Sequence, residues 1–459
     1  MYMQQQEIKI AYIGGGSRGW AWNLMSDLAV EPDLCGTVKL YDIDMEAAKH
    51  NEIIGNRLKG REDVKGNFTY EAVSTLKDAL TGCDFVVLSI LPGTFDEMES
   101  DVHAPEKYGI YQSVGDTVGP GGIIRALRTL PYYIEFAEAI KEYCPEAWVI
   151  NYTNPMTMCV QMMYKVFPEI KCFGCCHEVF GTQKVIAAMV QKEMGVEKVD
   201  RHEIKVNVQG INHFTWLNEM SYKGIDLMPM YAKYAKEYAE TGFTDGKDDN
   251  WMNNSFSSAN MVKFDLFNRY GVAAAAGDRH LAEFCPPWYL KNPESVKSWK
   301  FGLTTVAYRK EQLKERLAKS ARLVSGEEKM ALSTSGEEGV MQMKALKGMT
   351  TLITNVNIPN YGQIPNLPLG SVVETNAVFS HNSVKPVFAG AIDPAVQALI
   401  LPHCQNQRMT VEAVATKDLK LAYLAFCNDP LMTASCRDAR VLFDEMINNT
   451  KKYLGHFGL

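Results

Sequence analysis

IKIAYIGGGSRG, residues 8–19, is the stretch of sequence that decides the fold. Its first half is an apolar run, which predicts a buried β-strand, and its second half is a glycine-rich turn that opens a helix. Glycines at such a turn allow the backbone to come close to a ligand, so that a pyrophosphate can rest on the helix N-terminus. The stretch therefore predicts the start of a dinucleotide-binding sheet.

An acidic residue after the next predicted strand indicates which dinucleotide is bound. The strand at residues 38–41 is followed by Asp42, which stands about 20 residues after the last glycine of the turn. A carboxylate there accepts hydrogen bonds from the adenosine ribose and repels a 2′-phosphate, so NAD is favoured over NADP. The alternative is a glycine-rich turn without a ligand. The predicted NAD contacts are Gly14, Gly16, Ser17, Gly19 and Asp42.

Short β-branched runs alternate with helical patterns through the first half of the chain. Further strands are predicted at residues 84–90, 147–150 and 170–174, and an amphipathic helix at 122–143 that Pro131 kinks. This alternation is typical of a parallel sheet with crossover helices. We therefore predict an α/β protein in which residues 1–200 form a Rossmann-type, doubly wound NAD-binding domain. Residues 201–459 are predicted to form a C-terminal α+β domain for catalysis and oligomerisation.

The second half contains a polar stretch without periodicity at residues 240–250. We predict a loop there, within residues 240–258, and both a lid and an inert surface excursion stay open. Beyond it, helices are predicted at 311–323, 336–348 and 393–426, and two short strands within 366–388.

Composition excludes several classes of protein. The chain has 459 residues, of which 46% are hydrophobic and 22% charged, as in an ordinary globular protein. A net charge of −7 without a dense Lys/Arg run argues against a nucleic-acid partner. No apolar run approaches the roughly 18 residues of a membrane span, and residues 1–6 lack the pattern of a secretory signal. We therefore expect no membrane partner and a cytoplasmic location.

Eleven cysteines, an odd number in a chain without an export signal, predict reduced thiols rather than a disulfide framework. Most of them, such as Cys83 and Cys159, stand in apolar stretches and are expected in the core. Cys176 differs, because it follows the strand at 170–174, and ligands bind at the carboxyl ends of parallel strands. His213 lies in a second motif, GINHFTW at residues 210–216. One thiolate and one imidazole suit a catalytic divalent ion with open positions, whereas an inert buried cysteine is the alternative.

Eight motifs in order along the chain resemble glycoside hydrolase family 4. They are Ile13–Ser17, Gly115–Gly122, Arg125–Arg128, Asn151–Pro155, Cys176–Val179, Gly210–Trp216, Gly277–His280 and Asn366–Pro368. This family departs from the two-carboxylate mechanism of other glycosidases by using NAD and a metal. The resemblance implies a C-terminal domain of the lactate/malate dehydrogenase-like type. Cys-His-Glu-Val at residues 176–179 is most similar to the α-galacturonidases, although galactosidase and glucuronidase branches also carry Cys-His.

The resemblance also implies a reaction and its catalytic residues. NAD oxidises the sugar C3 hydroxyl, a base removes the C2 proton, and the C1 substituent leaves by elimination; water then adds to C1 and the hydride returns to C3. Cys176 and His213 would hold Mn²⁺ or another divalent metal. Asp278 falls at the position of the C2 base. His177 and Asp116 are rival general acids, and His177 is favoured because an imidazole both donates and accepts near neutral pH.

Three further residues are predicted to bind substrate. Asn154 resembles the family position beside the sugar hydroxyls, and His280 is a second polar contact. Arg279 is the candidate partner of a uronate carboxylate, through a bidentate fork, unless it only pairs with a structural acid. Aromatic residues are candidates for stacking on a sugar ring or for the core: Trp216, Trp288 and Tyr289.

The resemblance thus implies an α-galacturonidase that binds a small uronide and forms a homodimer or homotetramer. Other specificities of the same family, for α-galactosides, α-glucosides or α-glucuronides, stay open. An NAD-dependent 2-hydroxy-acid dehydrogenase and a non-catalytic NAD-binding regulator are alternatives from other classes. The pair Cys176 and His213 counts against both of these, because neither needs a metal.

Overall fold

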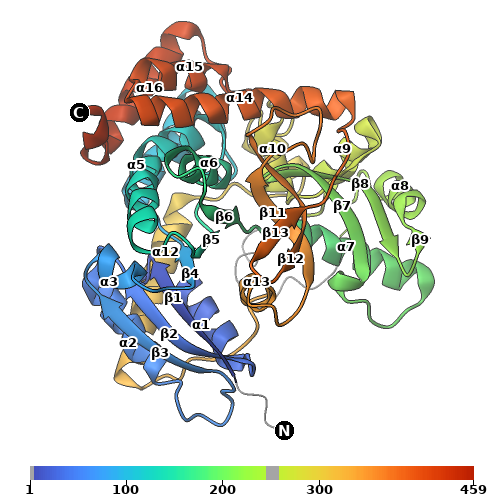
Figure 1. The fold of residues 1–459 in the computed structure, drawn as a ribbon. Helices are drawn as coiled ribbons and strands as arrows, with labels where there is room; N and C mark the ends of the chain where they lie inside the picture. Colours follow the sequence, from blue (N-terminus) through green and yellow to red (C-terminus); the bar gives the residue numbers. More distant parts are fainter. Residues whose placement is uncertain (1–4, 244–257) are drawn as a thin grey trace.

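A nine-stranded mixed sheet forms the centre of the computed structural model, which describes residues 5–243 and 258–459. Its order is β13-β12-β11-β6-β5-β4-β1-β2-β3 (Figure 1). The first six strands along the chain are mutually parallel. They are β1 (Gln6–Ile13), β2 (Leu34–Tyr41), β3 (Asn67–Val73), β4 (Phe85–Leu88), β5 (Trp148–Asn151) and β6 (Lys171–Gly174). Their spatial order, 3-2-1-4-5-6, is that of a dinucleotide-binding sheet.

Crossover helices cover both faces of the parallel part. They are α1 (Trp20–Val30), α2 (Met45–Asn56), α3 (Leu76–Leu80), α4 (Phe95–His103), α5 (Gly119–Tyr143) and α6 (Met156–Val166), with the 3₁₀ turn η1 (Ala104–Tyr108) between α4 and α5. Buried side chains on the two faces form separate apolar clusters, as expected for a sheet covered on both sides. The open carboxyl ends of the strands are therefore left as the place for a ligand.

Three antiparallel strands from the last third of the chain extend the sheet beyond β6. They are β11 (Leu352–Pro359), β12 (Val372–Ser380) and β13 (Ser383–Pro386). β11 joins the parallel part through the pair Asn357 and Gly174. Strands from the C-terminal third of the chain thus form one edge of the nucleotide-binding sheet.

A second, smaller sheet stands beside β12 and has the order β10-β8-β7, with β9 paired to β8 (Figure 1). Its strands are β7 (Ile204–Ile211), β8 (Phe214–Tyr222), β9 (Ile225–Asp226) and β10 (Ala273–Ala274). An apolar cluster joins this sheet to the helices beside it. Those helices are α7 (Glu178–Met194), α8 (Met228–Glu237) and α9 (Met261–Tyr270). The side chain of Asn212, in the tight turn between β7 and β8, reaches Cys176 just after β6.

The remaining helices pack at several places around the two sheets. They are α10 (Asp278–Phe284), α11 (Pro293–Ser298), α12 (Val306–Ser325), α13 (Gly339–Leu346), α14 (Pro394–Thr416), α15 (Leu419–Asn428) and α16 (Cys436–Thr450), with 3₁₀ turns η2 (Arg201–Glu203), η3 (Lys451–Tyr453) and η4 (Gly455–Phe457). α14 packs on α5 and α6, α15 packs on α14, and α16 packs on α15 (Figure 1).

The structure confirms the predicted fold class and the first strand, turn and helix. The helix predicted at 122–143 starts three residues earlier, at Gly119, and Pro131 lies inside it. β3 and β11 were not predicted. All eleven cysteines are free, as expected for reduced thiols. The possible lid at 240–258 falls mostly outside the described residues. In the part of the chain that the structure describes, no helix is long and apolar enough to span a membrane.

Candidate functional site

The glycine turn between β1 and α1 has the geometry of an anion-binding site. Gly14 has a φ of 95°, and a Cβ there would stand 2.0 Å from the Ser89 carbonyl oxygen, so no other residue fits. Gly19 precedes the first residue of α1 and supplies no capping side chain, and the first turn of this helix holds no acid. The start of α1 is therefore a place where an anion such as a dinucleotide pyrophosphate can bind.

Asp42 lies at the carboxyl end of β2, where it braces this turn. One of its oxygens accepts a hydrogen bond from the Gly16 N–H at 2.8 Å, and the other accepts one from the Asp44 N–H at 2.9 Å. Burial raises the pKa of Asp42, and the two N–H groups oppose that shift. Each carboxylate oxygen accepts more than one hydrogen bond, so ribose hydroxyls can still be bound. The residues present thus fit an NAD adenosine.

A second group of polar residues gathers beyond the carboxyl ends of β5 and β6. Asp116 comes from the loop before α5, His213 from the β7–β8 turn and His280 from α10. One ligand atom of each lies within 4.8 Å of the other two. His213 has a φ of 65°, in the left-handed region, and its ring stacks on that of His280 with centroids 3.8 Å apart. These three residues are called the triad below.

A hydroxyl group links two members of the triad. Thr117 Oγ1 donates to Asp116 Oδ1 at 2.7 Å and lies 2.9 Å from His213 Nδ1. The side-chain Nδ2 of Asn154 donates to the other carboxylate oxygen of Asp116 at 3.4 Å. The backbone carbonyl of Asn154 accepts a hydrogen bond from Arg125 Nε at 3.2 Å. The loop at residues 113–117 is thereby fixed against both halves of the molecule.

Glu178, the first residue of α7, contacts both histidines on its side of the site. Its Oε2 accepts a hydrogen bond from the Gly277 N–H at 2.5 Å. Its Oε1 lies 3.6 Å from His280 Nε2 and 3.9 Å from His177 Nε2. On the far side of its ring, His177 Nδ1 lies 3.1 Å from Glu337 Oε1. A single carboxylate therefore sets the position of two imidazoles.

The charges in the site favour a carboxylate and neutral imidazoles in the triad. Burial opposes the charge of Asp116, but Arg125, His280 and His213 outweigh it and hold its pKa well below the ordinary value. Burial, with the neighbouring His280, lowers the pKa of His213 to about 3. Burial also lowers the pKa of His280, although Glu178 and Asp116 oppose the shift. A neutral imidazole is the form that binds a metal.

His177 has different surroundings. Burial lowers its pKa, but Glu337 and Glu178 outweigh this, and the net shift is upward. Its side chain is half-buried, whereas His213 and His280 are buried. His177 thus differs from the triad in both charge and accessibility.

Cys176 lies beside this site but outside the triad. Burial raises the pKa of its thiol, and Glu374 and Glu178 raise it further, while the Asn212 side chain opposes the shift. Glu374, on β12, accepts hydrogen bonds from Asn212 at 3.2 Å and from Asn355 at 2.7 Å. The charged group that raises the pKa of the thiol most is therefore Glu374, a buried carboxyl group whose own pKa burial raises to about 7.

Two family models together match nearly the whole chain. The model described as family 4 glycosyl hydrolase matches residues 9–192, and that of the family 4 glycosyl hydrolase C-terminal domain matches residues 208–432. The chain belongs to glycosyl hydrolase family 4. It is 63% identical to an alpha-galacturonidase from Thermoanaerobacterium saccharolyticum, over 98% of this chain and 97% of that protein.

Two solved structures share the fold of this chain. A crystal structure from Bacillus subtilis has 52% identity and a TM-score of 0.91, and the match covers 96% of this chain and 100% of that one. A 6-phospho-alpha-glucosidase from gut microorganisms, solved with NAD and Mn²⁺, shares the fold with a TM-score of 0.80 at 19% identity, over 98% and 99% of the two chains.

In this family 4 protein, the predicted residues Asp116, Asn154, His177, His213 and His280 do gather in one place. Their contacts, given above, run through Thr117 and Glu178. Neither of those two residues was singled out from the sequence, although Glu178 belongs to the Cys-His-Glu motif.

Asp278 and Arg279 stand at the start of α10. The Asp278 carboxylate accepts hydrogen bonds from the backbone N–H groups of Val262 and Lys263, at 3.3 and 3.2 Å, and so caps α9. Burial raises its pKa. Its described contacts lie at α9, and its role as C2 base stays a prediction. The Arg279 guanidinium donates to the Thr304 hydroxyl and interacts electrostatically with Glu178.

Glu283 is a further site residue that the sequence did not indicate. Its Oε1 accepts hydrogen bonds from the Val114 and Gly115 N–H groups, at 2.7 and 2.8 Å. Burial raises its pKa to about 8. Glu283 therefore ties α10, which carries His280, to the loop that carries Asp116.

The aromatic candidates mostly belong to the core. Trp216 and Tyr289 are fully buried. Trp288 is 38% exposed, and the Arg269 guanidinium lies 4.9 Å from its ring centroid. Trp216 and Tyr289 therefore pack the interior instead of facing a sugar.

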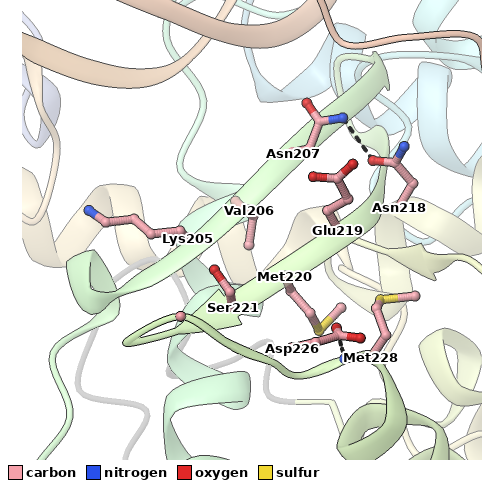
Figure 2. Close-up of a pocket in the computed structure, with 10 residues that line it drawn as sticks. Lys205, Val206, Asn207, Asn218, Glu219, Met220, Ser221, Asp226 and Met228 are labelled. Atoms are coloured by element: carbon pink, nitrogen blue, oxygen red, sulfur yellow. Dashed lines mark hydrogen bonds between the residues drawn. The ribbon is translucent and has the colours of Figure 1, made fainter.

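A separate cavity of about 440 Å³ lies on the small sheet. Figure 2 shows its lining by side chains of β7, β8 and the segment through β9, with the hydrogen bond between Asn207 and Asn218 at its rim. None of the predicted site residues lines it. The cavity is therefore distinct from the triad and the glycine turn.

We expect Asp42→Ser to weaken NAD binding about 10-fold and to narrow the preference for NAD over NADP. The change removes a charged acceptor, and hydrogen bonds to charged groups contribute about 1.5–3 kcal/mol. Calorimetric titration of both dinucleotides measures the effect. Asp44→Asn is the matched control, because Asp44 caps α2 through the Ala47 N–H and an asparagine can keep that bond. Unchanged affinities for Asp42→Ser would contradict the assignment.

Proposed function

We propose that this family 4 glycosyl hydrolase cleaves α-galacturonides with the help of NAD and a divalent metal ion. The observation that carries the proposal is that the triad, Arg279 and the Cys-His-Glu motif lie together in one site. This site is at the edge of a dinucleotide-binding sheet. The high identity to an alpha-galacturonidase supports the choice of substrate.

Each bound group has a defined chemical contribution. NAD supplies the reversible oxidation of the sugar C3 hydroxyl, which makes the C2 proton acidic. The metal ion supplies Lewis-acid stabilisation of negative charge at the sugar oxygens. The neutral imidazoles and the ionised carboxylate of the triad fit such an ion, and the uncapped start of α1 fits the dinucleotide.

The residues of the chain divide the remaining work. Asn154, fixed through Asp116 and Arg125, orients a sugar hydroxyl. His177 protonates the leaving oxygen, because its ring is half-buried and Glu337 holds one of its nitrogens. Asp278 is the base that takes the C2 proton. Arg279 binds the uronate carboxylate.

The test is a panel of α-galacturonides, α-galactosides, α-glucosides and α-glucuronides, assayed with NAD, Mn²⁺ and a thiol reductant. We expect the galacturonide to be hydrolysed fastest, with NAD unchanged in amount and solvent deuterium appearing at C2 of the product. NADH accumulating in proportion to product would indicate a dehydrogenase instead. A faster galactoside, glucoside or glucuronide would overturn the substrate assignment.

Arg279→Met is expected to raise KM for galacturonides about 10- to 100-fold and to leave the weak hydrolysis of galactosides nearly unchanged. A bidentate bond between guanidinium and carboxylate is among the strong hydrogen bonds, and only the uronide can form it. Steady-state kinetics on both substrates measures the difference. Thr304→Val, which removes the hydroxyl group that Arg279 contacts, is the control. It shows how much of the effect comes from a change in the position of the Arg279 side chain. Equal losses on both substrates would contradict the role.

We also infer that the protein acts in the cytoplasm as a homodimer or homotetramer. Eleven free cysteines fit a reducing compartment. Large apolar side chains exposed near one end of the main sheet fit a subunit contact: Tyr361, Leu369 and Phe388. Light scattering after size-exclusion chromatography measures the assembly, and a monomer at micromolar concentration would contradict it.

A further inference from the structure

We propose that the segment at residues 331–338, called the strap below, positions the imidazole of His177 from helix α1, and that Asp27 on α1 fixes the strap there. The strap, all of which the structure describes, lies between α12 and α13 and has no regular secondary structure. The inference rests on the proposed function for the role of His177 as general acid. It adds a positioning role for residues that lie outside the catalytic motifs.

The strap is bound to α1 at two neighbouring positions. The Ser26 hydroxyl donates to the Ser333 carbonyl at 2.7 Å and accepts from the Ser333 N–H at 2.8 Å. One oxygen of Asp27 accepts a hydrogen bond from the Ser335 N–H at 2.7 Å, and the other accepts one from the Ser335 hydroxyl. Burial raises the pKa of Asp27 to about 6, and the two bonds from Ser335 oppose that shift. Because hydrogen bonds to a carboxylate are stronger than those between neutral groups, Asp27 is the main attachment of the strap.

Ser335 connects this attachment to Glu337. Its hydroxyl oxygen, which donates to Asp27, also accepts a hydrogen bond from the Glu337 N–H at 3.1 Å. Gly336, between these two residues, has a φ of 82°, in the left-handed region that glycine favours. The Glu337 side chain then reaches the imidazole, with its Oε1 3.1 Å from His177 Nδ1. A continuous chain of contacts therefore joins α1 to His177.

The end of the strap is also held from another side. Glu338, its last residue, is 7% exposed, and its Oε1 lies 2.8 Å from an Arg201 guanidinium nitrogen and 3.4 Å from His202 Nε2. Helix α13, which follows the strap, packs on α1 (Figure 1). Glu337 is thus fixed on both sides, so its carboxylate stays beside His177 as long as the strap is attached.

The proposed reaction explains why the acid is positioned from α1. The C3 hydroxyl of the sugar must face the dinucleotide while the leaving oxygen on C1 of the same ring faces the proton donor. The start of α1 is the place for the pyrophosphate, and Asp27 stands about two turns further along the same helix. A misplacement of about 1 Å at a reacting group costs about 100-fold in rate. An imidazole positioned from α1 keeps its place relative to the dinucleotide, and both groups can then act on one sugar.

The kinetic test uses the full-length enzyme with NAD and Mn²⁺, on alkyl and nitrophenyl galacturonides. On the alkyl substrates we expect Glu337→Gln to lower kcat about 10- to 100-fold and Asp27→Asn about 3- to 10-fold. Both should change KM, the Kd of NAD and kcat on nitrophenyl substrates less than about 3-fold, because a good leaving group needs no protonation. Glu337→Asp keeps the charge and should recover part of the loss. Glu31→Gln is the matched control, because it removes a different contact of α1, with Lys344 at 2.8 Å.

Ring signals of ¹⁵N-labelled histidine in the cofactor-free protein give a measurement that does not depend on catalysis. The signals of His177 are those that His177→Asn lacks. We expect them to move in Glu337→Gln and in Asp27→Asn, and to stay in place in Glu31→Gln. Unmoved signals in Asp27→Asn, or equal losses of kcat on both substrate types, would overturn the proposal. Signals that move as expected, in an enzyme whose His177→Asn variant shows no leaving-group dependence, would support the positioning role and contradict only the proposed acid.

Discussion

Replacing Arg128 by methionine is expected to lower the free energy of unfolding by about 3–5 kcal/mol, because the change leaves a buried carboxylate without its partner. Arg128 on α5 is 0% exposed and Asp101 on α4 is 1% exposed. The guanidinium binds both carboxylate oxygens of Asp101 and donates through Nε to the Pro92 carbonyl at 3.0 Å. Burial raises the pKa of Asp101, and Arg128 is the main group that opposes the shift.

Urea-induced unfolding of the full chain measures this loss. Arg440→Met is the matched control: Arg440 pairs with Asp444 at 2.8 Å, but both side chains are more than half exposed. Its loss should stay below about 1 kcal/mol, because surface ion pairs contribute little. The double change Arg128→Met with Asp101→Leu should recover much of the loss, since no unpaired charge is then buried. A loss below about 1 kcal/mol for Arg128→Met alone would show that the pair is not essential.

The parallel part of the fold, with the exception of β3, could be predicted because local patterns of residues mark its strands. β1 and β4 to β6 are short apolar runs followed by turns or helices, and such patterns show in sequence. β11 was missed because it carries Asn355 and Asn357, which interrupt the apolar pattern. Both amides donate to Glu374 on β12, so their burial is satisfied only by a partner elsewhere in the chain. No local pattern reveals such a pair.

The candidate site, like the fold, was only partly predictable from the sequence. His213 was indicated by its own motif, whereas His177 and Asp116 became candidates through the resemblance to family 4. Glu178 was not assigned a role, since its partner Gly277 is 99 residues away. Glu283 left no signal, because the backbone groups it binds lie 169 and 168 residues earlier. Sequence thus located the chemical groups, whereas their orientation depends on contacts that only the tertiary fold creates.

His177→Asn is expected to lower kcat about 10²- to 10⁴-fold on galacturonides with an alkoxide leaving group, and far less on nitrophenyl galacturonides. Loss of a general acid removes a contribution of this size, and a good leaving group needs no protonation. His177 fits the role because Glu337 holds its Nδ1 at 3.1 Å and its ring is half-buried. Leaving-group plots of log kcat for the variant and the parent enzyme measure the difference in slope.

Asp116→Asn provides the contrast, because the two residues were rival acids. Asp116 is hydrogen-bonded to Thr117 and Asn154 and stands beside Arg125, so it stays a carboxylate and has no proton to give. Its removal should lower kcat by a similar factor for good and poor leaving groups. A steeper leaving-group dependence for Asp116→Asn than for His177→Asn would reverse the assignment. Thermal unfolding of both variants shows that neither loss of rate comes from loss of the fold.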